Sequence, residues 1–196
     1  MTMAAVIDNR TAQAAARPHT SGIARVNILS DLAAAEPVWR MLEQRADFST
    51  AYQRFDLLSA WQREIGTREG ASPYIVIAVD AEQRPLLLLP LALEQIHGIR
   101  VAAFMGGKHT TFNLGLWDPD FAATATPADL ARLLAELRHH GRADVLALTR
   151  QPLRWHELAN PFAQWPHQPS VNDCPLLSMA SPVDPTALIS NSFRKR

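Results

Sequence analysis

One segment near the middle of the sequence combines residue types that could bind a ligand. Two glycines, Gly106 and Gly107, are followed by Lys108 and His109 and, after three more residues, by Asn113. Glycines at the end of a strand let the backbone turn sharply or approach a ligand closely, and the side chains after them supply hydrogen-bond donors. The pattern predicts a polar rim at the open end of a sheet, where ligands of α/β folds often bind. A hairpin or bulge with solvated polar side chains explains the same pattern and is the commoner use of paired glycines.

We find no stronger catalytic or metal-binding motif in the sequence. It contains no glycine-rich phosphate loop, no Gly-x-Ser-x-Gly nucleophile elbow and no metal-ligand spacing. His139 and His140 are adjacent on a predicted helix, so their side chains diverge and make a poor metal pair. The single Cys174 excludes an internal disulfide, fits a reducing compartment and is best explained as a small buried hydrophobe. We therefore predict no metal site and assign no catalytic residue.

The composition predicts a globular protein without a strong electrostatic field. Of the 196 residues, 47% are hydrophobic and 19% are charged, which is enough apolar material for a sizeable core. The 19 basic residues balance the 19 acidic ones, so the chain has no net charge that would attract nucleic acid or an anionic membrane. No apolar run is long enough to span a bilayer, and the N-terminus lacks the pattern of a signal peptide. We expect a cytoplasmic protein.

A series of apolar runs predicts the sheet that carries the glycine segment. Residues 74–79 and 85–93 are apolar at nearly every position, as in strands that are covered on both faces. Two shorter runs, at 100–105 and 113–117, follow after polar or glycine turns, which predicts neighbouring antiparallel strands. Strands buried on both faces need helices on each side of the sheet.

The sequence before the sheet predicts an opening strand at residues 23–29 and then two helices. Ser30 or Asp31 can cap the first helix, which we expect to start afresh near Glu36 so that Pro37 falls in its first turn.

The second helix is predicted at residues 55–65 and stops at Gly66. Its apolar stripe includes Trp61, which is explained by core packing, although Trp61 could also form a wall of a groove beside residues 106–113.

The sequence after the sheet predicts a crossover helix and a returning strand. Thr126 at the N-cap, Pro127 at the first helical position and Asp129 begin the helix, and Gly141 ends it. Residues 143–148 then predict a strand that returns to the sheet.

The last part of the sequence predicts an irregular connector, a final strand and an unfinished helix. The connector with a short helix covers residues 153–168, and the strand covers 174–179. A helix from 186 onward still carries its apolar stripe when the sequence ends. We therefore expect a disordered tail at 1–21, one module at 22–180, and the start of a truncated second module, a basic helix, at 181–196.

The order of these pieces resembles a known family. The resemblance rests on the tryptophan-bearing helix, the Leu-Leu-Leu-Leu-Pro-Leu strand at 86–91, the Phe-Met-Gly-Gly turn at 104–107, the segment from Asn113 to Asp118-Pro119, and the basic ending at 190–196. Together they resemble the N-terminal half of the CelD-like (cellulose biosynthesis protein) acetyltransferases. That family is related to the GNAT superfamily and to the FemAB-like aminoacyl transferases. The resemblance covers roughly residues 25–196.

The resemblance implies a fold and a chemistry. The fold would be α/β (α+β), GNAT-like, with a mixed, largely antiparallel sheet flanked by helices. The chemistry would be transfer of an acyl group from acetyl-CoA or another acyl-CoA to an amine acceptor, without a metal. In such enzymes a strand bulge and a helix N-terminus hold the cofactor's pyrophosphate. The family is expected to carry this machinery mainly in its second module, and the pyrophosphate-loop pattern does not occur here, so the chain is expected to be incomplete for catalysis on its own.

Two hypotheses about function therefore stand side by side. The first is an N-terminal module of an acyltransferase, with a substrate groove near Gly106, Gly107, Lys108, His109 and Asn113. The second is a non-catalytic interaction module with the same fold. It would pair with a second module, a partner or another copy of itself through residues 185–196.

Overall fold

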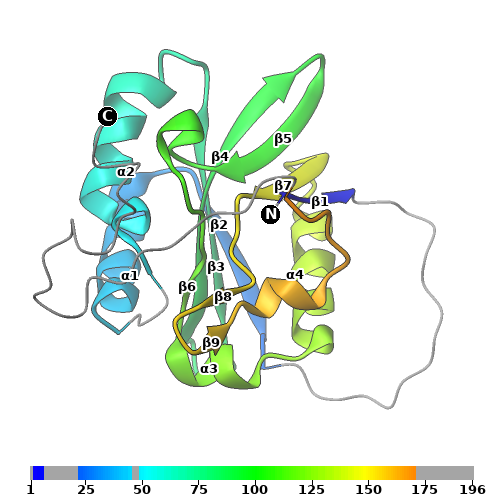
Figure 1. Cartoon of the computed structure of the whole chain (residues 1–196). Helices are drawn as coiled ribbons and strands as arrows, with labels where there is room; N and C mark the ends of the chain where they lie inside the picture. The colour runs from blue at the N-terminus through cyan, green and yellow to red at the C-terminus, as the bar shows by residue number, and fades with distance from the viewer. Residues whose placement is uncertain (1, 7–21, 46–48, 171–196) are drawn as a thin grey trace, which may run out of the picture.

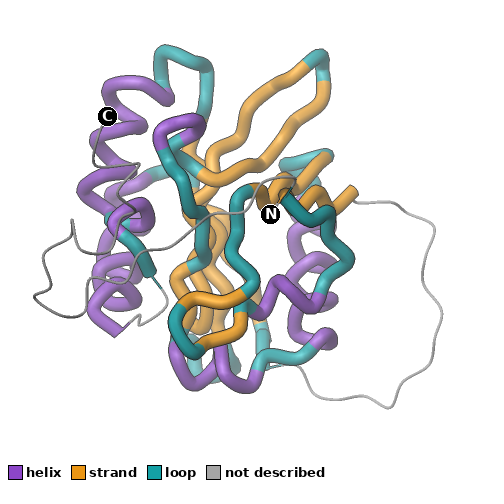
Figure 2. The backbone as a smooth tube through the Cα atoms, viewed as in Figure 1, coloured by secondary structure: helices purple, strands orange, loops and turns teal. Residues whose placement is uncertain are grey.

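The computed structural model describes residues 22–45 and 49–170, together with the backbone of residues 2–6. A mixed, largely antiparallel sheet stands between two layers of helices (Figures 1 and 2). The strands are β1 (Thr2–Val6), β2 (Arg25–Leu29), β3 (Ser72–Val79), β4 (Pro85–Ile96), β5 (Ile99–Phe104), β6 (Leu116–Trp117) and β7 (Val145–Thr149), and a separate hairpin is formed by β8 (Arg154–Trp155) and β9 (Leu158–Ala159). The helices are α1 (Leu32–Arg45), α2 (Phe55–Trp61), α3 (Pro119–Thr124) and α4 (Pro127–His140), with 3₁₀ turns η1 (Ala51–Gln53), η3 (Gly107–His109) and η4 (Pro161–Gln164) and a π-helical turn η2 (Gln62–Gly66). The predicted α+β class is confirmed.

The strands of the large sheet lie in the order β1-β7-β5-β4-β3-β2, and β6 also pairs with β4. Strands β2 to β5 form an antiparallel series, whereas β7 returns parallel to β5, with Ala102 opposite Leu146. Strand β4 changes partner along its length, because Leu88 pairs with Leu116 of β6 and Leu91 pairs with Phe104 of β5. The same edge of β4 therefore pairs with β6 near its start and with β5 over its second half.

Each face of the sheet has its own apolar core, as the alternation of side chains along a strand requires. Helices α1 and α2 cover one face, and α4 covers the other (Figure 1). The first core contains Trp39, Leu42, Leu58, Trp61, Ile75, Ile77, Leu88 and Leu116 among others. The second contains Tyr74, Val76, Leu87, Leu89, Leu91, Trp117, Leu130, Leu133, Leu137 and Phe162 among others. The prediction that the runs at 74–79 and 85–93 are covered on both faces is confirmed.

Helix α1 corrects one prediction about the first helix. The helix runs unbroken from Leu32 to Arg45, and it does not start afresh near Glu36. Pro37 therefore lies inside it and removes one intrahelical hydrogen bond, the one to the carbonyl of Ala33. Both residues are exposed, so water can solvate that carbonyl. The fully buried Trp39, whose Nε1 donates to the carbonyl of Gln53 at 2.9 Å, anchors the helix despite the proline.

Helix α4 begins and ends as the sequence predicts. The Thr126 hydroxyl accepts from the backbone N–H of Asp129, and the Asp129 carboxylate accepts from the backbone N–H of Thr126 at 2.8 Å. Gly141 has the left-handed conformation (φ 60°) that ends many helices. Arg100 then joins this end to β5, because its guanidinium donates to the carbonyl of Gly141 at 2.9 Å and forms an ion pair with Asp144 at 2.6 Å.

Two strand predictions are corrected. Residues 2–6 form β1, antiparallel to β7, in a region that we expected to be a disordered tail. This strand covers the outer edge of β7 through a contact between residues far apart in the sequence, which local patterns do not reveal. The strand predicted at 113–117 shrinks to Leu116–Trp117, because the backbone N–H of Asn113 donates to the carbonyl of Arg150 beyond the end of β7. The predicted strand at 174–179 and the predicted terminal helix lie outside the described residues.

Candidate functional site

The glycine segment leaves the sheet at the C-terminal end of β5. Gly106 adopts a left-handed conformation (φ 92°), and Gly107 (φ 52°) opens the short turn η3. A Cβ atom on Gly106 would collide with the methyl group of Thr110. The backbone path therefore requires glycine at position 106. This requirement explains Gly106, the first glycine of the pair, without a bound ligand.

Side chains at the end of β7 hold this segment in place. The Arg150 guanidinium donates to the carbonyls of Gly107 at 2.6 Å and Thr110 at 2.9 Å. The Asn113 amide donates to the carbonyl of Thr149 at 3.1 Å. The predicted ligand donor Asn113 is thus buried and bonded within the protein, which corrects its expected place on a polar rim.

Arg150 is a residue of this site that the sequence reasoning missed. Its position directly after a strand that runs parallel to β5 is the available signal, because the C-terminal ends of parallel strands lie at the same edge of a sheet. Its own left-handed backbone (φ 56°) reflects the sharp turn at that edge.

Trp61 lies beneath the turn, as its predicted place beside the segment requires. A Cβ atom on Gly107 would lie 3.8 Å from Cζ2 of Trp61. The indole ring is 6% exposed and belongs to the core on the α1–α2 face, so core packing is confirmed for it. Within the described part of the chain, its Nε1 donor has no hydrogen-bond partner. An unpaired buried donor is costly, and the Nε1 atoms of Trp117 and Trp155 share this feature, so it does not by itself mark a ligand site.

The backbone directly after Trp61 is unusual. Residues Gln62–Gly66 form a π-helical turn, a rare conformation that is found frequently at functional sites. The Gln62 amide donates to the carbonyl of Ala71 at 2.8 Å, whereas its buried Oε1 has no partner among the described residues. The sequence pattern predicted a regular helix over residues 55–65 and gave no sign of the π-helical turn.

Lys108 and His109 form the exposed rim of the segment. Across residues 22–45 and 49–170, neither side chain makes a hydrogen bond or an ion pair that would occupy it. The structure therefore places Trp61 beside Gly107 and leaves the side chains of Lys108 and His109 exposed to solvent. The arrangement can bind a polar or anionic group, but it holds no paired nucleophile and base.

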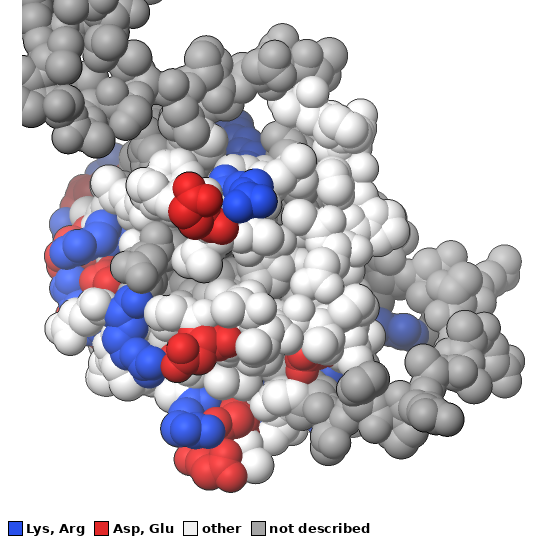
Figure 3. All heavy atoms as spheres, turned by 60° about the horizontal axis from the view of Figure 1, so that its bottom comes forward, with Lys and Arg blue, Asp and Glu red and all other residues white. Residues whose placement is uncertain are grey.

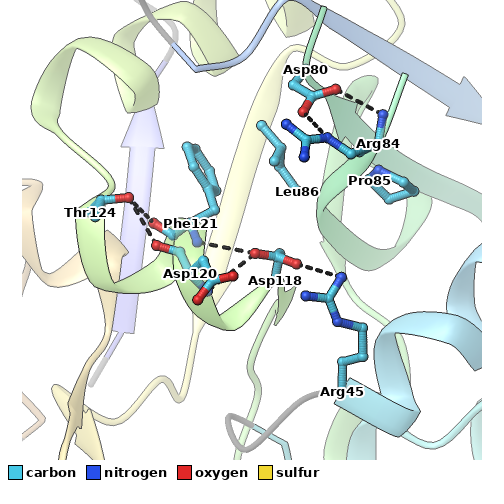
Figure 4. Close-up of a pocket in the computed structure, with 9 residues that line it drawn as sticks. All are labelled: Arg45, Asp80, Arg84, Pro85, Leu86, Asp118, Asp120, Phe121 and Thr124. Carbon is cyan, nitrogen blue, oxygen red and sulfur yellow. Dashed lines mark hydrogen bonds and ion pairs between the residues drawn. The ribbon is translucent and has the colours of Figure 1, made fainter. Parts of the chain in front are cut away.

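A cavity of about 330 Å³ lies at the N-terminal end of β4, and the sequence reasoning missed it (Figure 4). It is lined by Arg45, Asp80, Arg84, Pro85, Leu86, Asp118, Asp120, Phe121 and Thr124. Asp118 accepts from the backbone N–H groups of Asp120 and Phe121, both at 3.1 Å, and pairs with Arg45 at 2.9 Å. Asp118-Pro119 is a helix-start signal that could have located this wall.

The second wall of the cavity is the turn between β3 and β4. Burial raises the pKa of Asp80, but hydrogen bonds from the backbone and side chain of Arg84 outweigh it and hold the pKa below its usual value. The Asp80 carboxylate in turn raises the pKa of Arg84. The ion pair of Asp118 with Arg45 therefore joins the start of α3 to the end of α1. The ion pair of Asp80 with Arg84 closes the turn between β3 and β4.

Among the described residues, neither the distribution of charged side chains nor the placement of possible metal ligands indicates a further site. On the face shown in Figure 3, acidic and basic side chains alternate and form no broad patch of one sign. In the described ranges, no three His, Cys, Asp or Glu side chains gather as metal ligands would. None of the helices in those ranges is long and apolar enough to cross a membrane. Cys174, which the sequence predicts to be a small buried hydrophobe, lies outside the described residues.

Comparisons with known proteins give the chain no relative. No model of a protein family matches the sequence, and searches of curated proteins and of solved structures also found no match.

Proposed function

We propose that this chain is the N-terminal, acceptor-side module of a GNAT-like, acyl-CoA-dependent N-acyltransferase of the CelD-like type, and that it is incomplete for catalysis on its own. The cosubstrate would be acetyl-CoA or another acyl-CoA, and the acceptor would be an amine. The proposal includes a role in cellulose or related polysaccharide production. It also places the protein in the cytoplasm, a reducing compartment that suits a chain with one cysteine.

The observation that carries the proposal is the meeting of two parallel strand ends at the glycine segment. Strands β5 and β7 run parallel, and beyond their C-terminal ends Arg150 donates to the carbonyl of Gly107. Ligands of sheets with parallel strands often bind outside this edge. The exposed Lys108 and His109 supply polar groups there.

The incompleteness is supported by the N-terminus of α4. A helix N-terminus binds a pyrophosphate through free backbone N–H groups. In α4 the first helical residue, Pro127, has no N–H, and the N–H of Asp129 donates to the Thr126 hydroxyl. The Asp129 carboxylate also lies at this end, where it accepts from the N–H of Thr126 at 2.8 Å and from the N–H of Gly22 at 2.6 Å. A second negative group would be repelled by it. The helix that follows the sheet therefore offers the cofactor no anchor, and this feature favours a cofactor site in a second module.

Calorimetric titration with acetyl-CoA tests the cofactor side of the proposal. We expect no saturable binding by this chain up to about millimolar cofactor, which is beyond the usual range for metabolite-using enzymes. Saturable binding that Lys108→Ala or Gly107→Asp weakens would place the cofactor site in this chain and overturn the claim that it is incomplete.

Amide chemical shifts test the acceptor side. We expect glucosamine, an amino sugar, to shift the backbone amides of residues 106–110, and we expect glucose at the same concentration to leave them unchanged.

The alternative function is a non-catalytic interaction module. It would be favoured if neither acetyl-CoA nor any amine among glucosamine, lysine and spermidine changed the spectrum. In that case the segment after β5 would serve only to connect β5 to β6.

A further inference from the structure

The cavity at the N-terminal end of β4 has the size of a small-molecule site, and the proposed acyl transfer gives it no role. Its volume of about 330 Å³ lies at the lower end of the range for ligand pockets. One wall is the turn between β3 and β4, and the other is the start of α3 (Figure 4). The two walls are joined by a hydrogen bond from the backbone N–H of Asp118 to the carbonyl of Leu86, at 2.9 Å. A ligand would therefore lie between two anchored segments of backbone.

Part of the lining is apolar. Pro85, Leu86 and Phe121 contribute to it. Phe121 belongs to the core on the α4 face, and Leu86 packs against that core, so both side chains are held in place. An apolar group of a ligand would be stabilised here by its removal from water.

Two arginine side chains line the cavity and keep hydrogen-bond donors free. Nη1 of Arg45 lies 2.9 Å from the Asp118 carboxylate. Nε of Arg84 donates to Asp80 at 2.7 Å, and its Nη2 lies 3.6 Å from Glu82. A guanidinium carries five N–H groups, so these contacts leave donors free on both arginines. The two side chains are 53% and 75% exposed, which leaves those donors accessible to a ligand.

Asp118 lies within electrostatic reach of both arginines. Hydrogen bonding to Asp80 is the main cause of the raised pKa of Arg84, and the charge of Asp118 in the other wall contributes to it. The Asp118 carboxylate is itself satisfied, because it accepts from two backbone N–H groups of α3 and pairs with Arg45. The free guanidinium donors around it are suited to the carboxylate of a ligand, with which they form charge-assisted hydrogen bonds.

The formal charges of the lining do not cancel. Two arginines and three aspartates line the cavity, which gives a net charge of −1. Arg45 pairs with Asp118 and Arg84 pairs with Asp80, so the unmatched charge is that of Asp120. Asp120 is exposed, and its carboxylate makes no hydrogen bond or ion pair within residues 22–45 and 49–170. The net charge disfavours a simple anion, and the two guanidinium groups disfavour a simple cation.

We propose that this cavity binds a small zwitterion, a free α-amino acid with an apolar side chain. The carboxylate of the ligand accepts from Arg45 and Arg84, and its ammonium group pairs with Asp120. Its side chain covers Leu86 and Phe121. The cavity shares no residue with the glycine segment, so this proposal does not rest on acyl transfer.

Three related ligands test the two charges separately by calorimetric titration of the full chain. L-Leucine carries both charges, leucinamide lacks the carboxylate, and N-acetyl-L-leucine lacks the ammonium group. We expect L-leucine to bind with a Kd below about 1 mM, within the usual range for metabolites. Each derivative loses one charge-assisted contact and should bind at least about tenfold more weakly.

Two variants remove the matching charges of the protein. Arg84→Gln and Asp120→Asn should each weaken the binding of L-leucine about tenfold or more. Arg63→Gln and Glu64→Gln are the matched controls, because they make the same charge changes at an exposed ion pair outside the cavity. Both controls should leave the affinity unchanged. Circular dichroism checks the fold of all four variants.

The combination of variants and ligands separates a binding role from a structural one. Arg84→Gln should weaken the binding of L-leucine but leave that of leucinamide unchanged, because leucinamide has no carboxylate to lose. Asp120→Asn should likewise leave the binding of N-acetyl-L-leucine unchanged. A variant that only distorted the cavity would weaken all three ligands equally.

Backbone amide shifts locate the bound ligand. We expect L-leucine to shift the amides of residues 80–86 and 118–124, with the exception of the prolines, and to leave residues 106–110 unchanged. Shifts at 106–110 alone would assign the ligand to the glycine segment and overturn the proposal. The titration with acetyl-CoA concerns a different site, so its outcome does not decide this one.

Three further results would overturn the proposal. The first is the absence of saturable binding of L-leucine with a Kd below about 1 mM. The second is equal affinity for L-leucine and either derivative, which would make the cavity a site for a simple cation or a simple anion. The third is a loss of affinity in Arg63→Gln or Glu64→Gln as large as that in Arg84→Gln or Asp120→Asn.

Discussion

At the scale of single residues, the glycine segment combines structural and exposed positions. Gly106 and Asn113 serve the path of the chain, since one adopts a left-handed conformation and the other bonds to the end of β7. The side chains of Lys108 and His109 make no hydrogen bond or ion pair among the described residues. Both are exposed, so their nitrogen atoms are available to a ligand. Trp61 belongs with the structural positions, because it is buried in the core on the α1–α2 face.

The constraint at Gly106 can be measured. Gly106→Ala should destabilise the protein by about 2–4 kcal/mol, because an L-residue resists a φ of 92° and because the new methyl meets Thr110. Adding Thr110→Ser removes the obstructing methyl group and should recover part of the loss. Unfolding in urea provides the measurement.

Gly98 provides the matched control for this prediction. It has a similar φ of 84°, but a Cβ atom there would meet nothing within 4 Å. Gly98→Ala should therefore cost only the conformational part, about 1–2 kcal/mol. Equal losses at Gly98 and Gly106 would contradict a steric role for Thr110.

At the scale of secondary-structure elements, hydrophobic patterns and capping residues correctly predicted β3, β4 and the start of α4. The apolar runs gave β3 and β4, and Thr126, Pro127 and Asp129 gave the start of α4. The unbroken α1 was missed because tertiary packing of Trp39 outweighs the cost of Pro37.

The site itself was only half predictable. The glycine pair and Trp61 could be found because their residue types are informative. Arg150 was missed because its contacts with Gly107 and Thr110 join residues about 40 positions apart, and its one signal, a place directly after β7, depends on the parallel pairing of β7 with β5. The π-helical turn was missed for a related reason, since nothing in the sequence Gln62–Gly66 departs from an ordinary helix end.

The junction between α4 and β7 predicts a pH dependence. Hydrogen bonds from the side chain and backbone of Arg100 lower the pKa of Asp144 to about 2. In the unfolded chain an aspartate titrates near its usual value of about 3.9. Because the folded-state pKa is the lower one, this carboxylate stabilises the protein above about pH 4, and the contribution is lost as the pH falls toward 2.

Thermal unfolding between pH 2 and pH 6 measures this contribution. Arg100→Gln should make stability fall less steeply with decreasing pH than in the wild type. Arg63→Gln changes the same charge at an exposed pair with Glu64, and it should leave the wild-type slope unchanged. A wild-type slope in Arg100→Gln would show that the Asp144 pair does not couple folding to protonation.

At the scale of the whole molecule, stability should be highest where the two helical layers enclose the sheet. The residues of β3 from Tyr74 to Val79 are all buried, as are those of β4 from Leu87 to Ala92. Past Leu93 the β4–β5 hairpin extends beyond β3, and Ile96 and Ile99 are about half exposed at its tip.

Hydrogen exchange tests this gradient of stability. We expect the slowest backbone amides in the paired middle of β3 and β4, which open only with global unfolding. Amides at Gln95, Ile96 and Ile99 should exchange much faster through local fraying. Uniform protection along β4 would mean that another surface covers the hairpin tip in solution.

The pairing of β1 with β7 also imposes an order in time. Thr2–Val6 precedes the other strands of the sheet in the sequence, but its partner Val145–Thr149 is synthesised only after nearly all of the described chain. Closing so long a loop before other contacts exist is entropically unfavourable. The strands β2 to β5, which are neighbours along the chain, can pair while synthesis continues. Strand β1 precedes β2 to β5 in the sequence, yet we expect it to join the sheet after them.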